Sequence, residues 1–322
     1  MFVTMTDIPE IHFQAARAAI GGSIHNTPLL TSRRIGETVG CTFLGKCENL
    51  QKTGSFKARG ALNKLLSLSD RAKARGVVTI SAGNHAQALA WASATTDTPC
   101  TVVMPEGASQ TKVRASKAYG ANVILHGTVH EAFERAFQLR DELGLTFIHP
   151  FDDPDIIAGA GSTGIEIMDE SPKTTVIVVP VGGGGQIAGI AGAVKPLFGN
   201  IRIYGVEPTG AAAMHLSLKK GQPVRLDSVN TIADGLAPPM AGDLNFAFVK
   251  EYVEDVVLVD DADIVDGMKR VSECMKLIVE PSGAAAVAAL TKGLIPVGPE
   301  DTVVAVLSGG NVDSKTIARL FA

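Results

Sequence analysis

The sequence is poor in cysteine, and this scarcity excludes two classes of protein. Its 322 residues include only four cysteines, which are Cys41, Cys47, Cys100 and Cys274. No two of them form a Cys-x-x-Cys pair. This pattern excludes a disulfide-stapled secreted domain and does not have the spacing of a zinc site. We expect four reduced thiols that act as small buried hydrophobes, as in cytoplasmic proteins.

Long apolar runs are also missing. The longest reach about eight residues, whereas a helix that spans a bilayer needs about 20. Asp7 and Glu10 interrupt the N-terminal stretch, which therefore lacks the apolar core of a signal peptide. We expect no membrane partner and no secretory leader.

The chain has no excess of positive charge. It carries 29 Lys and Arg against 33 Asp and Glu, a net charge of −4, and no basic stripe. Nucleic acid is therefore not an expected partner. Aromatic residues make up only 5% of the chain, while 46% of residues are hydrophobic and 34 are glycine. This apolar content excludes a disordered chain and predicts a fold built mainly from small and aliphatic side chains.

Short β-branched runs alternate with helical patterns along the chain. The runs predict strands over Val77–Ile80, Thr101–Met104, Asn122–His126, Thr146–His149, Val176–Pro180, Ile201–Glu207, Asp255–Val259 and Thr302–Leu307. Several are apolar throughout, as in strands that are covered on both faces. Helical spacing predicts helices over Val129–Leu143, ended by Gly144, and over Asp261–Leu277. The alternation predicts an α/β fold with mainly parallel, twisted sheets flanked by helices.

Turn residues cluster in two places, Ser67–Asp70 and His149–Asp155, which are the candidate hinges. They predict a chain with two lobes. Residues 1–67 and 150–322 would form a large domain, and residues 68–149 a small mobile domain inserted into it.

Four consecutive glycines form the first motif that bears on function. Gly182, Gly183, Gly184 and Gly185 follow an apolar strand, and Gln186 opens a helical run. Backbone N–H groups between a strand and a helix bind phosphate, because no side chain obstructs them and the helix dipole favours an anion. The spacing matches neither the dinucleotide fingerprint nor the P-loop. A glycine-rich turn without a ligand is the alternative.

The second motif is the run GSFKARGA over residues 54–61, which contains Lys57. Ser55 is the predicted N-cap of a helix that continues to Leu66, so Lys57 falls in the first turn. The helix dipole and burial both lower the pKa of an amine at this position. A lowered pKa is what a Schiff-base lysine requires. An ordinary surface lysine is the alternative.

Two further strand ends carry polar side chains. The run SAGNHAQ, residues 81–87, follows a predicted strand and presents Ser81 and Asn84 at a helix start, where free N–H groups bind a carboxylate. A capped helix start with a solvated His85 is the alternative. Ser308 ends another predicted strand and lies where α/β folds bind ligands.

Together these motifs resemble the pyridoxal-phosphate enzymes of the tryptophan-synthase-β fold type, in the threonine/serine dehydratase and serine racemase branch. In that family the lysine of a Ser-Phe-Lys-x-Arg-Gly-Ala motif forms a Schiff base with the cofactor, which implies this role for Lys57. The match stays in register from Thr27 to Asp313. The resemblance implies two lobes, each with a mainly parallel sheet, and a homodimer.

The resemblance implies a set of contacts for pyridoxal 5′-phosphate. Phe56 would lie against its ring, Asn84 would bond its ring hydroxyl, and Ser308 would face its ring nitrogen. The glycine run and the backbone N–H of Gln186 would hold its phosphate. Glu280 would line its cavity.

A substrate site is implied beside the cofactor. Ser81, Asn84 and His85 would hold the substrate carboxylate, with Ala82 next to them in the same loop. Gly235 would line the wall of the substrate cavity.

The implied reaction is β-elimination from a small hydroxy amino acid such as L-threonine or L-serine, which gives a 2-oxo acid and ammonia. The ε-amine of Lys57 would remove the Cα proton, and the β-hydroxyl would leave with a proton from a nearby acid, for which the cofactor phosphate is a candidate. Ser308 is neutral and would not keep the ring nitrogen protonated, which favours elimination.

Two departures from the family pattern favour a dehydratase over a racemase. Racemases use a second serine in the loop to reprotonate Cα from the opposite face, and Ala82 has no proton to give. Their divalent metal site needs an aspartate where this chain has Ala213, and Glu207 alone leaves few oxygen ligands, so no metal is expected. Serine racemase stays open as an alternative, as do dehydratases of 3-hydroxyaspartate or phenylserine.

Other classes remain as alternatives. A β-replacement synthase of this fold typically has SGNTG in the loop, with threonine where this chain has His85. A nicotinamide dehydrogenase would need the dinucleotide spacing, which is absent. A ligand-binding protein on the same fold would have no need of Lys57, and it would be colourless when purified.

Overall fold

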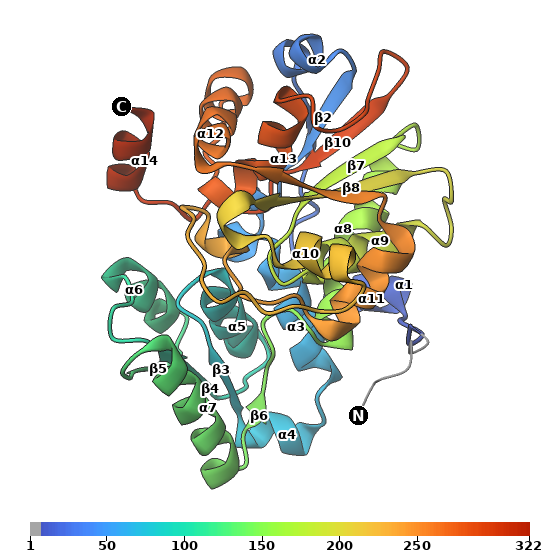
Figure 1. Ribbon diagram of the computed structural model, residues 1–322. Coiled ribbons are helices and arrows are strands. Elements are labelled where there is room, and N and C mark those ends of the chain that lie inside the picture. The colour runs from blue at the N-terminus through green and yellow to red at the C-terminus, as the bar shows by residue number, and fades with distance from the viewer. Residues whose placement is uncertain (1–7) are drawn as a thin grey trace.

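The chain forms two separate β-sheets (Figure 1). The computed structural model describes residues 8–322. The larger sheet contains β1 (Leu29–Thr31), β2 (Thr42–Lys46), β7 (Val176–Pro180), β8 (Arg202–Pro208), β9 (Asp255–Val259) and β10 (Thr302–Val306). The smaller sheet contains β3 (Val77–Ile80), β4 (Cys100–Met104), β5 (Asn122–Leu125) and β6 (Thr146–Phe147).

The strand order is β1-β2-β10-β7-β8-β9 in the six-stranded sheet and β5-β4-β3-β6 in the four-stranded sheet. Neighbouring strands run parallel except for β1 and β2, which are antiparallel. Parallel strands present all their carboxyl ends at one edge, which is where α/β folds bind ligands. The prediction of mainly parallel sheets flanked by helices is confirmed.

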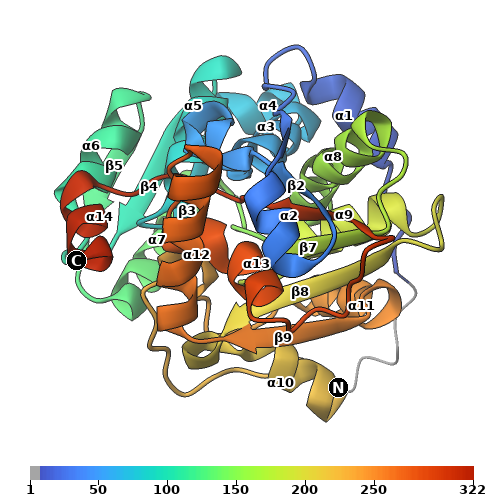
Figure 2. The same cartoon turned by 90° about the horizontal axis from the view of Figure 1, so that it is seen from above.

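Helices cover both faces of the six-stranded sheet. One face packs against α2 (Arg33–Val39), α12 (Asp261–Met275) and α13 (Pro281–Thr291), as the view from above shows (Figure 2). The other face packs against α8 (Pro154–Glu170), α9 (Gly185–Val194) and α11 (Asp243–Tyr252). Consecutive residues such as Val178 and Val179 belong to different cores, because side chains of a strand alternate between its faces.

The four-stranded sheet is covered in the same way. On one face lie α3 (Lys57–Ser67), α5 (Asn84–Thr95) and α6 (Gln110–Ala118), and on the other lies α7 (Val129–Leu143). A capping box of Thr128 and Glu131 starts α7, and Gly144 ends it at φ +64°. The bounds predicted for this helix are confirmed.

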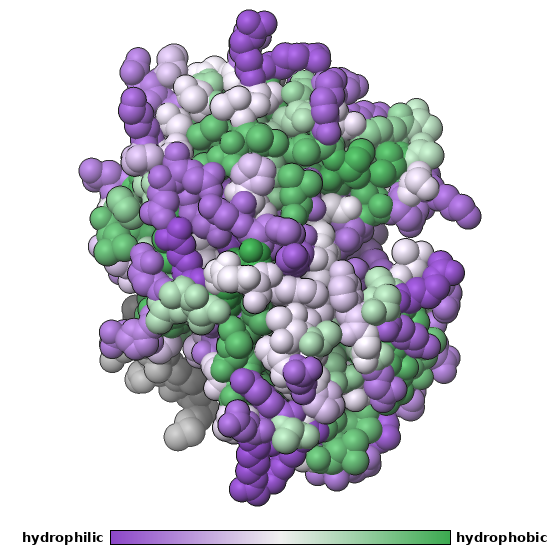
Figure 3. Space-filling model, turned by 180° about the vertical axis from the view of Figure 1, so that it is seen from behind, coloured by the Kyte–Doolittle hydropathy of each residue, from purple (hydrophilic) through white to green (hydrophobic). Residues whose placement is uncertain are grey.

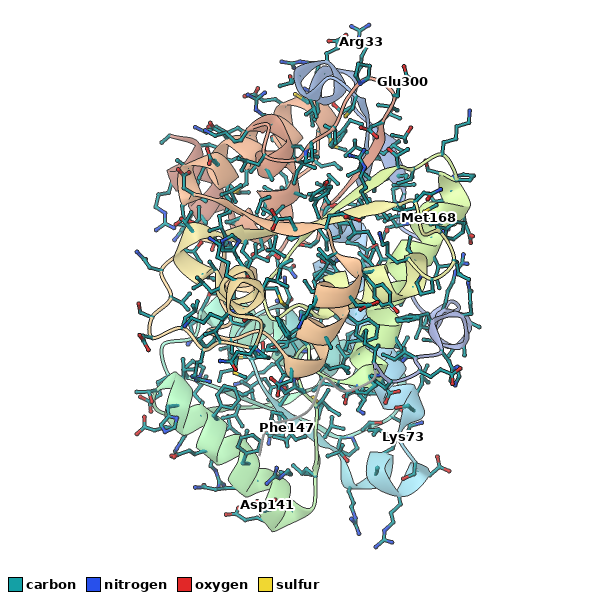
Figure 4. The ribbon with its side chains drawn as sticks, turned by 45° about the vertical axis from the view of Figure 1, so that its right-hand side comes forward. Arg33, Lys73, Asp141, Phe147, Met168 and Glu300 are labelled. Carbon is teal, nitrogen blue, oxygen red and sulfur yellow. The ribbon has the colours of Figure 1, made fainter. Side chains whose placement is uncertain are left out.

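The remaining elements are short. They are α1 (Phe13–Ile20), α4 (Asp70–Arg75), α10 (Ala213–Lys220), α14 (Ser314–Phe321) and the 3-10 turns η1 (Glu48–Leu50), η2 (Lys52–Gly54), η3 (Thr209–Ala211) and η4 (Asp234–Leu236). Figure 4 shows the outer ends of the two halves, with Arg33 and Glu300 at the end of the six-stranded half and Lys73 and Asp141 at the end of the four-stranded half.

Four predicted elements end earlier than expected, and two of them, the strands predicted over Asn122–His126 and Thr302–Leu307, do so by one residue. The strand predicted over Thr146–His149 ends at Phe147, where its pairing with β3 ends. The helix predicted over Asp261–Leu277 ends at Met275, because Lys276 takes a left-handed backbone conformation with φ +61°.

Small residues let three helices pack closely, which accounts for part of the glycine content. A Cβ atom added to Gly60 of α3 would lie 2.8 Å from the carbonyl oxygen of Ile156 in α8. One added to Gly189 of α9 would lie 2.5 Å from the carbonyl oxygen of Ile157 in α8. Only glycine allows these backbones to approach so closely.

The strands of the smaller sheet all come from residues 77–147, and those of the larger sheet come from the chain on either side. The exact domain boundaries at residues 67 and 150, and the mobility of the smaller part, stay a prediction. Among residues 8–322, no helix combines the length and the apolar character needed to cross a bilayer.

Candidate active site

Lys57 is the first residue of α3, a helix that contacts both α8 and α5 and so lies between the two halves. Its Nζ donates a hydrogen bond to the carbonyl oxygen of Pro150 at 2.7 Å and lies 5.0 Å from the centroid of the Phe56 ring. Burial lowers the pKa of Lys57 to about 8. A large share of an amine with this pKa is unprotonated in mildly alkaline solution, as nucleophilic attack requires.

Ser55 does not cap α3, so that prediction is wrong. Its backbone pairs with Gly309 in an isolated antiparallel bridge, and the next residue, Phe56, donates its N–H to the carbonyl oxygen of Ser308 at 3.1 Å. These bonds hold Ser55 in an extended conformation beside the end of β10. The buried Oγ of Ser55 has no hydrogen-bond partner among residues 8–322. The same bonds bring Lys57 next to the end of β10.

The four glycines form a turn between β7 and α9, as predicted. Gly184 takes a left-handed conformation with φ +95° and precedes the first residue of α9. The carbonyl oxygen of Gly184 accepts the N–H of Ala188 at 2.9 Å. Within the described chain, no acceptor takes a hydrogen bond from the backbone N–H groups of residues 182–187. Free N–H groups at a helix N-terminus fit an anionic group such as phosphate.

Gln186 lies in the first turn of α9 and is buried. Neither its Oε1 nor its Nε2 has a hydrogen-bond partner in residues 8–322. A buried amide without partners costs free energy. The side chain, and not only the backbone N–H named by the prediction, is therefore a polar group available to a ligand at the glycine turn.

A second helix N-terminus of the same kind follows β3. Ser81 Oγ accepts the N–H of Gly83 at 3.1 Å, and α5 begins at Asn84. In the described part of the chain, the N–H groups of residues 84–87 donate to no acceptor. Ala82 is half-buried and packs against the core beneath α5. This end of α5 suits a carboxylate.

His85 is buried rather than solvated, which excludes the simple capped-helix alternative for this motif. Its Nε2 lies 3.1 Å from Thr79 Oγ1. Burial, and to a smaller extent the nearby Lys57, lowers the pKa of His85 to about 3, so the imidazole is neutral. Because the imidazole is bonded to Thr79, the group that His85 offers to a carboxylate is its backbone N–H.

Asn84, Glu280 and Asn311 come together from distant parts of the sequence. Asn84 Nδ2 donates to Glu280 Oε1 at 2.6 Å, and Asn311 Nδ2 donates to Asn84 Oδ1 at 2.8 Å. Burial raises the pKa of Glu280 to about 7. These bonds connect α5 of the four-stranded half to residues beside α13 and β10 of the six-stranded half.

Ser308 and Gly235 lie beside the same group. Ser308 follows β10, is buried, and donates from Oγ to the carbonyl oxygen of Ser282 at 3.4 Å. The Oγ of Ser282 accepts the N–H of Gly235 at 2.9 Å. A Cβ added to Gly309, the residue after Ser308, would lie 2.5 Å from Glu280 Oε1. The structure thus groups the predicted residues from four separate segments.

Pro150 links Lys57 to the glycine turn. Its neighbour Phe151 is buried, and a Cβ added to Gly183 would lie 2.4 Å from the Phe151 ring. His149 precedes this pair, and its Nδ1 accepts the N–H of Phe151 at 3.3 Å. The glycine turn therefore lies near the Lys57 amine, and the start of α5 does too, because Lys57 contributes to lowering the pKa of His85.

Two contributors to this region escaped the sequence analysis. Lys112 of α6 pairs with Asp234 of η4 at 2.9 Å, which joins the two halves. Asn245 of α11 donates from Nδ2 to the carbonyl oxygen of Gly183 at 2.8 Å. Neither residue belongs to a motif, and an isolated lysine or asparagine has no spacing that could have marked it.

The side chain of Glu207 lies at the start of α10. Its Oε1 and Oε2 accept the N–H groups of Met214 and His215, each at 2.8 Å, so it caps α10. Burial raises the pKa of Glu207 to about 8. Among residues 8–322, no group of three His, Cys, Asp or Glu side chains is arranged to bind a metal ion.

The chemistry of these groups fits pyridoxal phosphate. The N–H groups of residues 182–187 have no acceptor among residues 8–322, as a phosphate site requires. The amine of Lys57 has a lowered pKa, as an amine that reacts with an aldehyde requires. The hydroxyl of Ser308 and the amide of Asn84 supply neutral polar contacts for a ring.

Comparison with known proteins also indicates pyridoxal phosphate as the cofactor. The family model described as pyridoxal-phosphate dependent enzyme matches residues 20–309. The chain is 41% identical to an L-threonine ammonia-lyase of Thermotoga maritima over 319 residues, which cover 99% of this chain and 78% of that protein. It is also 41% identical to a serine racemase of Dictyostelium discoideum over 322 residues, which cover 99% of this chain and 98% of that protein.

A solved structure of maize serine racemase is similar over the whole fold. It superposes with a TM-score of 0.92 at 37% sequence identity, and the match covers 96% of this chain and 95% of that one. The chain therefore belongs to the family of pyridoxal-phosphate dependent enzymes, and pyridoxal phosphate is its cofactor.

Proposed function

We propose that this protein is an ammonia-lyase that converts a β-hydroxy amino acid, such as L-threonine or L-serine, into a 2-oxo acid and ammonia. The observation that carries the proposal is the position of the Lys57 amine, with its pKa lowered to about 8, near two helix N-termini with free N–H groups. One end suits the cofactor phosphate and the other the substrate carboxylate. The relatives named above support it.

The chain's own residues have distinct tasks in this proposal. The N–H groups of residues 182–187 would hold the phosphate, Asn84 would bond the ring hydroxyl, and Ser308 would face the ring nitrogen. Phe56 packs against the ring, and Glu280 stays beside Asn84.

Lys57 carries the proton transfer. Bound pyridoxal phosphate supplies the electron sink that makes the substrate Cα–H acidic. The free amine of Lys57 accepts that proton, which its lowered pKa favours. The backbone N–H groups of Asn84 and His85, together with Ser81 Oγ, orient the substrate carboxylate, and Gly235 leaves room for the substrate side chain.

Ala82 supports elimination over racemisation. It lies in the substrate loop, where a serine would supply a proton from the face opposite Lys57, and its methyl group cannot do so. A proton removed by Lys57 therefore has no second donor at this position. Serine racemase is the alternative activity on the same site.

A panel assay tests the proposal. Release of 2-oxo acid is measured from L-threonine, L-serine, 3-hydroxyaspartate and phenylserine, with Lys57→Ala as the control. We expect release from at least one substrate by the unmodified enzyme and none by Lys57→Ala. Release from no substrate overturns the proposal, and D-serine formed from L-serine without 2-oxo acid assigns the racemase alternative.

We also propose a cytoplasmic homodimer in which residues 68–149 form the small mobile domain. Four free cysteines support a reducing compartment. Hydrophobic residues gather in a band on the half built on the six-stranded sheet (Figure 3), which supports self-association there. Sedimentation at several protein concentrations tests the dimer, and a single monomeric species would contradict it.

A further inference from the structure

The glycine turn needs support from outside itself. Residues 182–185 carry no side chains, and glycine loses more conformational freedom on folding than any other residue. A turn of four glycines would sample many backbone conformations unless other residues fixed it. The carbonyl oxygen of Gly183 shows what fixes it, because it accepts two hydrogen bonds from the start of α11. They come from the N–H of Gly242 at 3.1 Å and from Asn245 Nδ2 at 2.8 Å.

Asn245 is built into this position from several sides. It is fully buried, and its Nδ2 also donates to the carbonyl oxygen of Phe151 at 3.2 Å. Asp152 Oδ1 accepts the backbone N–H of Asn245 at 3.3 Å. A Cβ added to Gly184 would lie 2.8 Å from Asn245 Cβ, so the side chain lies directly against the turn.

The hydrogen bond from Asn245 to the Gly183 carbonyl oxygen determines the direction of the next backbone N–H in the turn. In a trans peptide the C=O of one residue and the N–H of the next point to opposite sides. A hydrogen bond that draws the Gly183 C=O toward α11 therefore directs the Gly184 N–H away from α11. That N–H belongs to the set that has no acceptor in the described chain.

The chemistry of the side chain agrees with a donor role. Asn245 Nδ2 serves two carbonyl oxygens, while its Oδ1 is buried and has no hydrogen-bond partner among residues 8–322. An unpartnered buried oxygen is a cost, and its presence indicates that the two N–H bonds matter more. An aspartate at this position would place a carboxylate against two carbonyl oxygens and could donate to neither.

We propose that Asn245 is a positioning residue of the phosphate site, which acts by holding the Gly183 carbonyl so that the N–H groups of the glycine turn face the cofactor phosphate. The inference rests on the proposed placement of that phosphate on residues 182–187. Asn245 itself need not touch the cofactor.

The test separates the phosphate from the rest of the cofactor. Apoprotein is titrated with pyridoxal phosphate and with pyridoxal, which lacks the phosphate, and the absorbance change gives both dissociation constants. We expect Asn245→Leu to raise the dissociation constant for pyridoxal phosphate about tenfold while that for pyridoxal changes far less. The ³¹P signal of bound pyridoxal phosphate should shift as well.

Asn63 provides the matched control. It is also buried, and its Nδ2 donates to a backbone carbonyl, that of Asp155, at 2.8 Å. Asn63→Leu should leave the ratio of the two dissociation constants unchanged, because it lies in α3 and not against the glycine turn. If Asn245→Leu does not fold, Asn245→Ala is titrated instead.

Equal weakening of both ligands by the Asn245 variants, or no weakening, overturns the inference. These titrations contain no substrate. A wild-type enzyme that binds pyridoxal phosphate but releases no 2-oxo acid would overturn the proposed activity and leave this inference standing.

Discussion

The N-termini of α9 and α5 both follow a strand and a glycine-containing turn, but they differ in how other residues support them. The glycine turn before α9 is tied from behind by Asn245 and Gly242 and is packed by the Phe151 ring. The loop before α5 has open space beside Gly83, where an added Cβ would meet only Ser81 Oγ at 4.0 Å. A fixed donor set suits a resident cofactor, and a looser one suits a substrate that must enter and leave.

The contacts between the two halves of the molecule show the same difference between the glycine turn and the loop before α5. Asn84 donates a hydrogen bond to Glu280, and Lys112 pairs with Asp234, so polar side chains join α5 and α6 to the six-stranded half. The Lys112–Asp234 pair is largely exposed, so it can be broken at low cost. The comparison thus predicts that binding of the cofactor phosphate depends on the glycine turn and that binding of the substrate depends on the loop before α5.

The largest effect should come from the residue between the two ends. Lys57→Ala removes the amine that we propose as the cofactor attachment point and as the base, so kcat should fall by at least about 1000-fold. Steady-state release of 2-oxo acid measures this. Lys52→Ala, a half-buried lysine five residues earlier in the chain, is the control and should keep full activity. Activity of Lys57→Ala within tenfold of wild type would remove Lys57 from the mechanism.

The second effect concerns the titration of the same amine. At a pKa of about 8, about half of the Lys57 amine is unprotonated at pH 8, against about 0.3% for an ordinary lysine. The rate at which apoprotein reacts with pyridoxal phosphate should therefore rise with pH with a midpoint near 8. Because the folded pKa lies below the unfolded value of 10.5, this group also makes the apoprotein more stable as pH rises from 8 to 10.5. A midpoint near 10.5 would contradict the burial of Lys57.

The third effect concerns the stability that the buried ion pairs of Arg59 in α3 give to the fold. Arg59, two residues after Lys57, is fully buried and bonds Glu48 at 2.7 Å and Glu166 at 2.6 Å. Arg59→Met removes the cation that is hydrogen-bonded to the fully buried Glu48, while Glu166 keeps Lys46 at 2.8 Å, so the free energy of unfolding should fall by about 3–5 kcal/mol. Urea denaturation measures this. Arg140→Met, which breaks an exposed pair with Asp141, should show no measurable change.

The fourth effect concerns the chemistry of the loop before α5. Ala82→Ser restores a hydroxyl that can return a proton to Cα, so the ratio of racemisation to elimination should rise by about tenfold or more. Chiral chromatography of serine and an assay of pyruvate measure the two rates in one reaction. Ala82→Gly adds no hydroxyl and serves as the control. A ratio that stays unchanged would remove position 82 as the determinant of reaction type.

The smallest effect should come from the ion pair that crosses the halves. The Lys112 and Asp234 side chains are 29% and 78% exposed, so solvent and salt weaken their attraction. Lys112→Met should raise the KM for substrate by less than about threefold and leave the dissociation constant of pyridoxal phosphate unchanged. The difference should fade at high salt. An equal effect on cofactor binding would show that the two sides are not independent.

Local sequence signals identified most elements because their causes are local. Gly144 ends α7 where predicted, since a left-handed residue closes a helix regardless of its surroundings. The glycine turn was predictable for the same reason. The Ser55 cap was wrong because a bridge to Gly309, over 250 residues away in sequence, took the backbone of that segment. The contact of the His85 imidazole with Thr79 also depends on packing, and the place of His85 at the substrate carboxylate stays a prediction.

The sequence by itself indicated the family and the cofactor, because its four motifs resemble those of that family, and it named the candidate residues of the site. Only the tertiary structure decided which of them meet and what supports them. Asn84 reaches Glu280, and Asn245 reaches Gly183, across 196 and 62 residues of chain. Such contacts depend on how the two sheets and their helices pack, and a single asparagine carries no spacing from which that packing can be deduced.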